Sequence, residues 1–276
     1  MKLSFAEFNK VYLGSLDEIW PHWNETMQAE IARHCIAWSP DRMDFREYLQ
    51  ASSIRFYKAY CALVDSGCGS VCDVGGFWGV WPITAKKLGF DVAMTEAMKY
   101  YGDSFDPLFD VIRANGVEIF DHDPFSPEAS IDKHFEFVTV MAVLEHYPHS
   151  LRTFIENVKR MTTGNGRIYL EVPNIAYLPK RMGMLRGQTP LVQLADIYRS
   201  EEPFIGHHHE FTIEEMRDLA RLGGLKIITE ELYNYSMTGA NIKSLKSSIL
   251  YPAVSLAFKL FRTGRECIAV LCEIEK

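Results

Sequence analysis

Glycines and an acidic residue accompany the first short apolar run of the chain, Ser70–Val74. The acid is Asp73, and the turn after the run holds Gly75, Gly76 and Gly79. Glycine lets the backbone approach a ligand closely, and a helix that follows such a turn offers free N–H groups at its start. These residues are therefore candidates for binding a cofactor at the end of a strand.

The next apolar runs also end in residues that could line such a site. Glu96 closes the second run, where its carboxylate could accept hydrogen bonds from both hydroxyls of a ribose. Asp121 and Asp123 follow the third run, and either carboxylate could accept a hydrogen bond from the exocyclic amine of adenine. Because ligands of doubly wound sheets bind at the carboxyl ends of the strands, these positions fit an adenosine-containing cofactor. His122 and Met141, at the ends of the third and fourth runs, complete the predicted cofactor site.

Histidines at two places could supply acid–base catalysis. His146 follows the fourth run, which directs it towards the substrate, although it could equally fix the loop at the start of a helix. Adjacent side chains of an extended segment point to opposite sides, so His207, His208 and His209 are poorly placed to share one ion. We therefore predict no metal. His207 and His146 are the catalytic candidates, with His207 as the general base.

Alternating strand and helix patterns must position these residues. Helices between the first five strands imply a parallel sheet covered on both faces, and the last two strands, with no ordinary crossover helix between them, imply an antiparallel end. Thr212 and Glu215 are spaced as the capping box of a late helix. The fold class is a Rossmann-like α/β fold whose seven-stranded sheet is mostly parallel with an antiparallel last strand. The strands are predicted at residues 70–74, 91–95, 117–120, 137–141, 167–172, 226–230 and 268–273.

Residues 1–66 are predicted to form an N-terminal helical cap. Apolar residues recur there at helical spacing over 45–64, with Asp41 as the cap of that helix. Residues 67–276 form the main domain, which carries two long connections on its substrate side. These insertions are residues 175–206 and 234–266.

Charge and cysteine content exclude several classes of protein. A net charge of −7 argues against a nucleic-acid partner. The six cysteines form no C-x-x-C pair, so neither a zinc site nor a disulfide framework is expected. No apolar run has the length of a membrane span, and the N-terminus lacks the pattern of a signal peptide. We therefore expect a cytoplasmic protein.

Taken in order, these motifs resemble those of class I S-adenosylmethionine (SAM)-dependent methyltransferases. The likeness covers residues 67–232 and 268–273 and includes the acid and turn of 73–79 and the acid Glu96. Residues 143–146, Val-Leu-Glu-His, resemble a stretch of the ubiquinone-biosynthesis O-methyltransferases. Two further segments resemble the same group: residues 164–174, and residues 207–212 ahead of a helix that contains Glu214 and Glu215.

The turn departs from the family pattern at two positions. Phe77 stands where the second glycine of the turn is usual, and Trp78 replaces a small residue. A nicotinamide-dependent oxidoreductase is opposed more strongly, because its fingerprint needs glycine at residues 77 and 80. The resemblance implies a SAM-dependent methyltransferase. The alternative is a SAM- or nucleotide-binding partner protein that no longer transfers methyl groups, if Phe77 and Trp78 obstruct the cofactor.

The long connections suggest what the acceptor is. We expect methyl transfer to a hydroxyl, in preference to an amine or a carboxylate, of a small anionic acceptor such as a phosphorylated sugar or a lipid-linked glycan. The apolar spacing of 242–262 predicts a helix that packs on the domain, forms a homodimer or makes peripheral contact with a membrane. The basic residues that carry this expectation are Lys180, Arg181, Arg186, Arg199, Lys243, Lys246, Lys259, Arg262 and Arg265.

Overall fold

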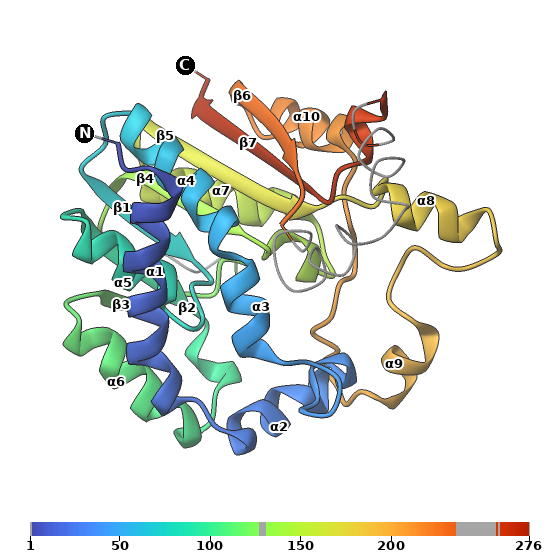
Figure 1. The fold of residues 1–276 in the computed structure, drawn as a ribbon. Coiled ribbons are helices and arrows are strands. Elements are labelled where there is room, and N and C mark those ends of the chain that lie inside the picture. The colour runs from blue at the N-terminus through green and yellow to red at the C-terminus, as the bar shows by residue number, and fades with distance from the viewer. Residues whose placement is uncertain (1, 127–130, 236–257, 259, 276) are drawn as a thin grey trace.

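A twisted seven-stranded sheet forms the centre of the protein in the computed structural model, which describes residues 2–126, 131–235, 258 and 260–275 (Figure 1). The strands lie in the order β3-β2-β1-β4-β5-β7-β6. Neighbours from β3 to β5 are parallel, whereas β7 is antiparallel to both β5 and β6. This confirms the predicted fold class. The strands are β1 (Ser70–Val74), β2 (Asp91–Glu96), β3 (Glu118–Asp121), β4 (Phe135–Met141), β5 (Thr162–Pro173), β6 (Leu225–Tyr233) and β7 (Cys267–Ile274).

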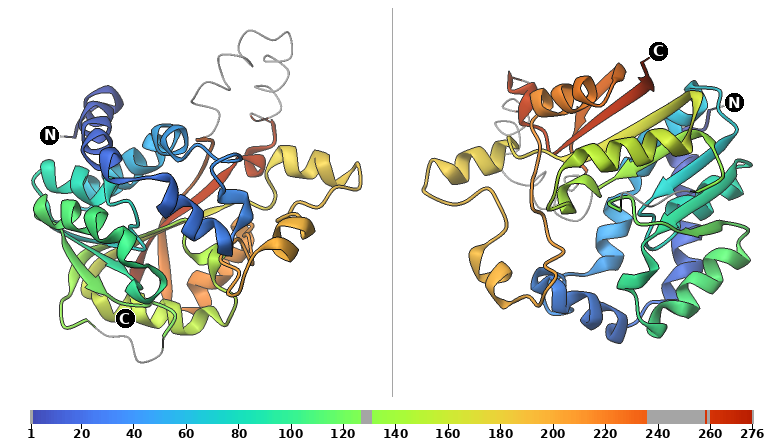
Figure 2. Two further views of the ribbon diagram at one scale, coloured as in Figure 1. Left: turned by 90° about the horizontal axis from the view of Figure 1, so that it is seen from below. Right: turned by 180° about the vertical axis from the view of Figure 1, so that it is seen from behind.

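Helices cover both faces of this sheet (Figures 1 and 2). The layer with α1, α4, α5 and α6 shares one buried apolar cluster with the sheet, and the layer with α7 and α10 shares another. α8 and α9 lie away from both layers (Figure 2). The helices are α1 (Phe5–Ile19), α2 (Glu25–His34), α3 (Phe45–Ala51), α4 (Ser53–Asp65), α5 (Val80–Lys87), α6 (Asp106–Ala114), α7 (Leu151–Met161), α8 (Leu178–Met184), α9 (Leu194–Arg199) and α10 (Ile213–Leu222).

Consecutive residues of the central strands face opposite helical layers. Val71 of β1 packs with the α1 and α5 side, and Cys72 next to it packs with the α7 and α10 side. In β4, Phe137 and Val138 divide between the layers in the same way. A strand buried on both faces is apolar without alternation, which is why these segments appear in the sequence as short continuous apolar runs.

The helix predicted over residues 45–64 is two helices. α3 begins after Asp44, whose side chain accepts a hydrogen bond from the backbone N–H of Glu47, so the predicted cap Asp41 was wrong. The break falls at the buried Ser52, between α3 and α4. The apolar spacing continues across the break, so periodicity alone could not locate it. By contrast, Thr212 and Glu215 form the predicted capping box of α10.

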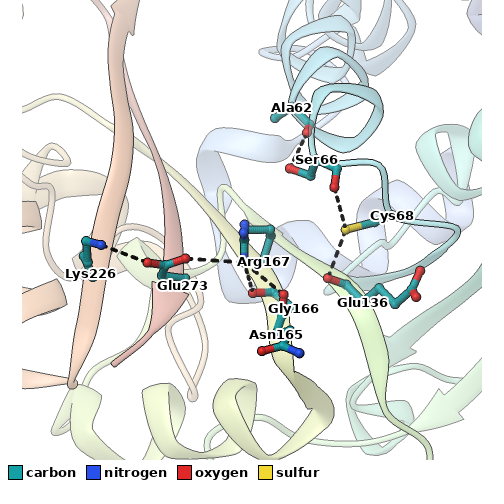
Figure 3. A network of polar contacts seen from close by, with 9 residues as sticks. All are labelled: Ala62, Ser66, Cys68, Glu136, Asn165, Gly166, Arg167, Lys226 and Glu273. Atoms are coloured by element: carbon teal, nitrogen blue, oxygen red, sulfur yellow. Dashed lines mark hydrogen bonds and ion pairs between the residues drawn. The ribbon is translucent and has the colours of Figure 1, made fainter. Parts of the chain in front are cut away.

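Polar contacts tie the strands together at the edge where β1 and β4 begin (Figure 3). Cys68 Sγ lies 3.4 Å from the carbonyl oxygen of Glu136, and Glu273 pairs with Arg167 at 3.6 Å and with Lys226 at 3.1 Å. These contacts join β4 to the segment before β1, and β7 to its neighbours β5 and β6. The candidate catalytic and cofactor-binding residues lie at the opposite edge, where the parallel strands end.

No helix in the described part of the chain is long and apolar enough to cross a membrane. Most of the helix predicted over 242–262, and the basic residues Lys243, Lys246 and Lys259, lie outside the described residues.

Candidate functional site

The turn from β1 into α5 begins the site at the carboxyl edge of the sheet. Gly75 and Gly79 have φ angles of +70° and +68°, the left-handed region that favours glycine. A Cβ on Gly79 would lie 2.5 Å from Ile112 Cγ1, so a larger residue there would force the Ile112 side chain of α6 to move. The turn is further held by a hydrogen bond from the N–H of Gly79 to the carbonyl of Gly76, at 2.8 Å. The sequence pattern thus placed this turn correctly.

Glu96 lies at the end of β2, directly beside this turn. Its Oε1 accepts a hydrogen bond from the backbone N–H of Phe77 at 2.5 Å, and its Oε2 accepts one from the Tyr101 hydroxyl at 2.8 Å. Burial raises the pKa of Glu96 to about 7, although both hydrogen bonds favour the charged form. Glu96 is therefore a buried acceptor whose charge changes near neutral pH.

A cluster of aromatic side chains adjoins the Glu96 carboxylate through Tyr101. The Phe77 ring stacks on Tyr101 with centroids 5.4 Å apart and meets Trp78 edge-on at 4.2 Å. Trp23 and Phe105 contact the same ring. Phe77 has a φ of +28°, which is unusual for a residue other than glycine. The two residues that depart from the family turn are thus part of an aromatic cluster that includes Trp23 from the N-terminal part of the chain.

The other predicted cofactor residues lie at the same edge in different surroundings. Asp73 is buried and accepts a hydrogen bond from Thr139 Oγ1 at 2.6 Å, and burial raises its pKa to about 7. Asp121 accepts a hydrogen bond from the backbone N–H of Met98 at 3.1 Å. His122 is buried, burial lowers its pKa, and neither ring nitrogen has a hydrogen-bond partner among the described residues. Met141 is buried at the end of β4.

The two catalytic candidates meet beyond the end of β4. The rings of His146 and His207 lie 4.9 Å apart and are nearly perpendicular. His146 Nδ1 lies 2.6 Å from the carbonyl oxygen of Ile205, and His207 Nδ1 lies 3.0 Å from Glu210 Oε1. A carbonyl and a carboxylate only accept, so each Nδ1 carries the proton in the neutral ring and each Nε2 keeps a lone pair. Burial and the neighbouring His207 together lower the pKa of His146 to about 3.

The three adjacent histidines point to different partners, as predicted. His208 Nε2 lies 2.9 Å from the carbonyl oxygen of Phe204, and His209 Nε2 lies 3.2 Å from Glu215 Oε1. Only His207 of the three faces His146 in a ring contact. The tertiary structure therefore selects one histidine of the run.

Three residues of the site were missed by the sequence analysis. Glu145 is buried, its Oε1 lies 4.0 Å from His207 Nε2, and burial raises its pKa to about 7. Glu210 orients His207, and Tyr101 bonds Glu96. For Glu210, burial favours a higher pKa, but hydrogen bonds from His207 and Lys180 outweigh it and lower the pKa. Two sequence features could have indicated these acids. Glu145 directly precedes His146, and Glu210 lies three residues after His207.

Glu145, His146 and His207 could together hold a divalent cation. One ligand atom from each lies within 4.8 Å of the other two. In addition, Glu145 Oε2 is buried without a hydrogen-bond partner in the described structure. Metal-bound histidines commonly donate their second ring N–H to a carbonyl or a carboxylate, as both of these histidines do.

A family model described as a methyltransferase domain matches residues 37–230. The chain belongs to this methyltransferase family. Membership makes it a SAM-dependent methyltransferase, which confirms the predicted enzyme class and cofactor. The matched region includes the turn, Glu96 and both histidine positions.

Solved structures share the fold of this methyltransferase at low sequence identity. A putative sarcosine dimethylglycine methyltransferase from Galdieria sulphuraria has a TM-score of 0.54 at 12% identity, over 82% of this chain and 88% of that chain. A SAM-dependent methyltransferase from Clostridium acetobutylicum has a TM-score of 0.52 at 11% identity, over 90% and 98%. These likenesses concern the fold alone. No curated protein sequence matches the chain.

The residues at the carboxyl edge fit SAM. The buried Glu96 carboxylate uses two acceptor positions of about four, so two remain for ribose hydroxyls. The buried His122 ring has two unpartnered nitrogens among the described residues, and it lies where β3 ends. The methyltransferase thus retains polar groups that a nucleoside would satisfy.

Proposed function

We propose that this methyltransferase moves a methyl group to a hydroxyl of a small anionic acceptor, such as a phosphorylated sugar or a lipid-linked glycan. The observation that carries the proposal is the hydrogen bond between His207 Nδ1 and Glu210 Oε1. It leaves His207 Nε2 free to accept a proton and sets a carboxylate where the resulting imidazolium is stabilised. The Val-Leu-Glu-His stretch of 143–146, which resembles the ubiquinone-biosynthesis O-methyltransferases, also supports a hydroxyl acceptor.

His207 suits the role of base better than His146. The Nδ1 of His146 is held by a neutral carbonyl, and the pKa of His146 is lowered to about 3. Such a weak base contributes little to removing the proton from an acceptor hydroxyl. We assign His146 to packing against His207 and to fixing the loop before Ile205. An amine acceptor would use the same base, whereas a carboxylate acceptor would need none.

SAM would be held by the turn at Gly75, Gly76 and Gly79, by Glu96, and by Asp121 or His122. When bound, it supplies an activated methyl group on a sulfonium. Methyl transfer is an in-line displacement, so the chain contributes mainly alignment and removal of the acceptor proton. Asp73 accepts a hydrogen bond from Thr139, which joins β1 to β4. We assign it to holding the turn in place and not to contact with the cofactor.

Basic residues of the segment after β5 support an anionic acceptor. The segment 175–206 follows β5 at the carboxyl edge of the sheet and carries four basic residues. Lys180 pairs with Glu210, the partner of His207, and so lies beside the proposed base. A lipid-linked acceptor would also bring the protein to a membrane surface, which is one of the three alternatives predicted for 242–262.

The group of Glu145, His146 and His207 offers a second way to activate a hydroxyl. A divalent cation held there would lower the pKa of a bound hydroxyl without a free histidine base. Metal analysis of the purified protein, with activity before and after EDTA treatment, separates the two mechanisms. Activity that survives metal removal supports His207 as the base, and activity that returns only with added cation supports the metal.

The acceptor is found by incubating lysate fractions with methyl-labelled SAM and the purified protein, followed by identification of the labelled molecule. We expect the label on a former hydroxyl oxygen of an anionic compound. The His207→Ala protein is the matched control and should leave the same fraction unlabelled. Label on a carboxylate, or equal labelling by both proteins, would contradict the proposed base.

A further inference from the structure

The segment from α8 to α9, residues 178–199, presents apolar side chains to solvent; we call it the arm. Figure 1 shows the arm projecting from the body of the domain, and the rear view of Figure 2 shows the same projection. Seven of its large apolar side chains are between 41 and 87% exposed. A concentration of exposed apolar groups of this kind marks an interaction surface. The seven are Met182, Met184, Leu185, Leu191, Leu194, Ile197 and Tyr198.

Both ends of the arm are anchored to the rest of the domain. At its start, Lys180 pairs with Glu210. At its end, the buried Asp196 accepts two hydrogen bonds from Arg42, at 2.6 and 3.1 Å, so the arm is joined to the N-terminal helices. The exposed side chains between these anchors are therefore held out from the domain by specific contacts.

The charges left on the arm are positive. Arg186 and Arg199 form no side-chain hydrogen bond or ion pair within the described residues. The arm's acid, Asp196, is already paired with Arg42. The exposed acids Glu201 and Glu202 follow directly, so the excess of cations is confined to the arm itself. Within the arm, cations next to apolar side chains are the pattern of surfaces that bind anionic lipids.

A second apolar segment lies beside the base of the arm. Arg181 contacts Thr263, with Nη2 lying 3.3 Å from its carbonyl oxygen and 3.2 Å from its hydroxyl. Leu260 and Phe261, just before Thr263, are exposed as well. The apolar surface is therefore wider than the arm alone.

The lengths of the helices favour a lipid surface over a second protein chain. α8 has seven residues and α9 has six, so neither offers the long continuous stripe that packs helix against helix. Separate apolar side chains can each enter the boundary between headgroups and acyl chains without such a stripe. Tyr198, the most exposed of the seven, belongs to a residue type enriched at that boundary.

We propose that the arm docks on an anionic membrane surface, with its apolar side chains among the lipids and Arg186 and Arg199 at the headgroups. This inference rests on the proposed function, because the enzyme would meet a lipid-linked acceptor at that membrane surface. It does not depend on the residues of 242–257.

Flotation with vesicles of phosphatidylcholine, with and without phosphatidylglycerol, tests the proposal on the full chain. Wild type should float with the anionic vesicles at low salt and less at high salt, because the Debye length shortens. The variant Leu185→Ser/Leu194→Ser/Tyr198→Ser should lose at least about tenfold in partitioning, since three apolar side chains no longer leave water. Arg186→Gln/Arg199→Gln should lose binding mainly at low salt.

The matched control is Leu222→Ser on α10, which removes an equally exposed leucine outside the arm. It should float like wild type. SAM affinity, measured on all variants, should stay unchanged, so a failure of the arm is distinguishable from a failure of the proposed methyl transfer. The proposal is overturned if wild type does not float, or if the triple variant floats equally. It is also overturned if the triple substitution instead converts a dimer to a monomer in light scattering, which would make the arm a subunit interface.

Discussion

The Tyr101 hydroxyl lies 2.8 Å from Glu96 Oε2 and donates a hydrogen bond to it. Glu96 is the acid predicted to bind the ribose, so the two hydroxyls of a nucleoside must share this carboxylate with Tyr101 and with the N–H of Phe77. The Tyr101 hydroxyl and the backbone N–H of Phe77 therefore occupy two acceptor positions of the acid that is predicted to bind the ribose.

Replacing Tyr101 by Phe should tighten SAM binding about two- to tenfold at a pH well above 7, where Glu96 stays ionised although it loses a hydrogen bond that lowers its pKa. The substitution removes a competitor whose net hydrogen bond is worth about 0.5–1.5 kcal/mol, while keeping the ring that stacks on Phe77. Isothermal titration measures the effect. Tyr100→Phe is the control, because Tyr100 is exposed and adjoins Tyr101. Weaker binding by Tyr101→Phe would mean that Tyr101 orients Glu96 for the ribose instead.

Glu96→Ala should weaken SAM binding by about 2–3 kcal/mol, because two ribose hydroxyls lose a charged acceptor. Titration with SAM and with S-adenosylhomocysteine should give similar losses, since both contain the ribose. If the variant binds SAM as tightly as wild type, Glu96 is a structural partner of Phe77 and Tyr101 and the nucleoside lies elsewhere.

SAM affinity should fall as the pH is lowered from about 8 to about 6. The pKa of Glu96 is raised to about 7 by burial, so the carboxylate that accepts the ribose hydroxyls becomes protonated over this range. The Glu96→Gln protein should bind more weakly at pH 8 and lose most of the pH dependence. An equal pH dependence in both proteins would assign the titration to another group.

Asp73→Asn should stabilise the protein at pH 8 more than at pH 5. The folded-state pKa of Asp73 is raised by burial from 3.8 to about 7, so its contribution to stability is fully present below about pH 4 and is lost as the pH rises through about 7. Asparagine keeps an oxygen for the Thr139 hydroxyl and removes the buried charge. The gain at pH 8 should be on the order of 2–4 kcal/mol by denaturant unfolding. A gain that does not depend on pH would show that burial of the charge is not its origin.

His207→Ala should lower kcat about a hundredfold or more and leave SAM affinity nearly unchanged. Glu210→Gln should lower kcat less, because glutamine still accepts from His207 Nδ1 but no longer stabilises the imidazolium. His146→Ala serves as the comparison and should retain more activity than His207→Ala. Equal activity of wild type and His207→Ala would mean that the acceptor needs no histidine base.

Local patterns in the sequence were enough to predict the sheet, the glycine turn after β1, the cap of α10 and the position of Glu96 at the end of β2. Strands buried on both faces must be apolar runs, glycine must occupy the left-handed positions 75 and 79, and Thr212 and Glu215 cap a helix through contacts three residues apart. Glu96 could be placed because the end of a parallel strand is where a ligand binds. Each of these signals depends only on neighbours along the chain.

Tertiary structure alone decided which side chains meet. His146 and His207 come from distant segments, and their contact depends on how the loop after β4 packs against residues 205–210. Tyr101 reaches Glu96, and Glu145 becomes buried, for the same reason. Packing between elements determines these distances and the burial of each side chain, and the spacing of residues along the chain does not predict them. The exposure of the arm likewise follows from its anchoring through Lys180 and Asp196, which the sequence showed only as two more charges.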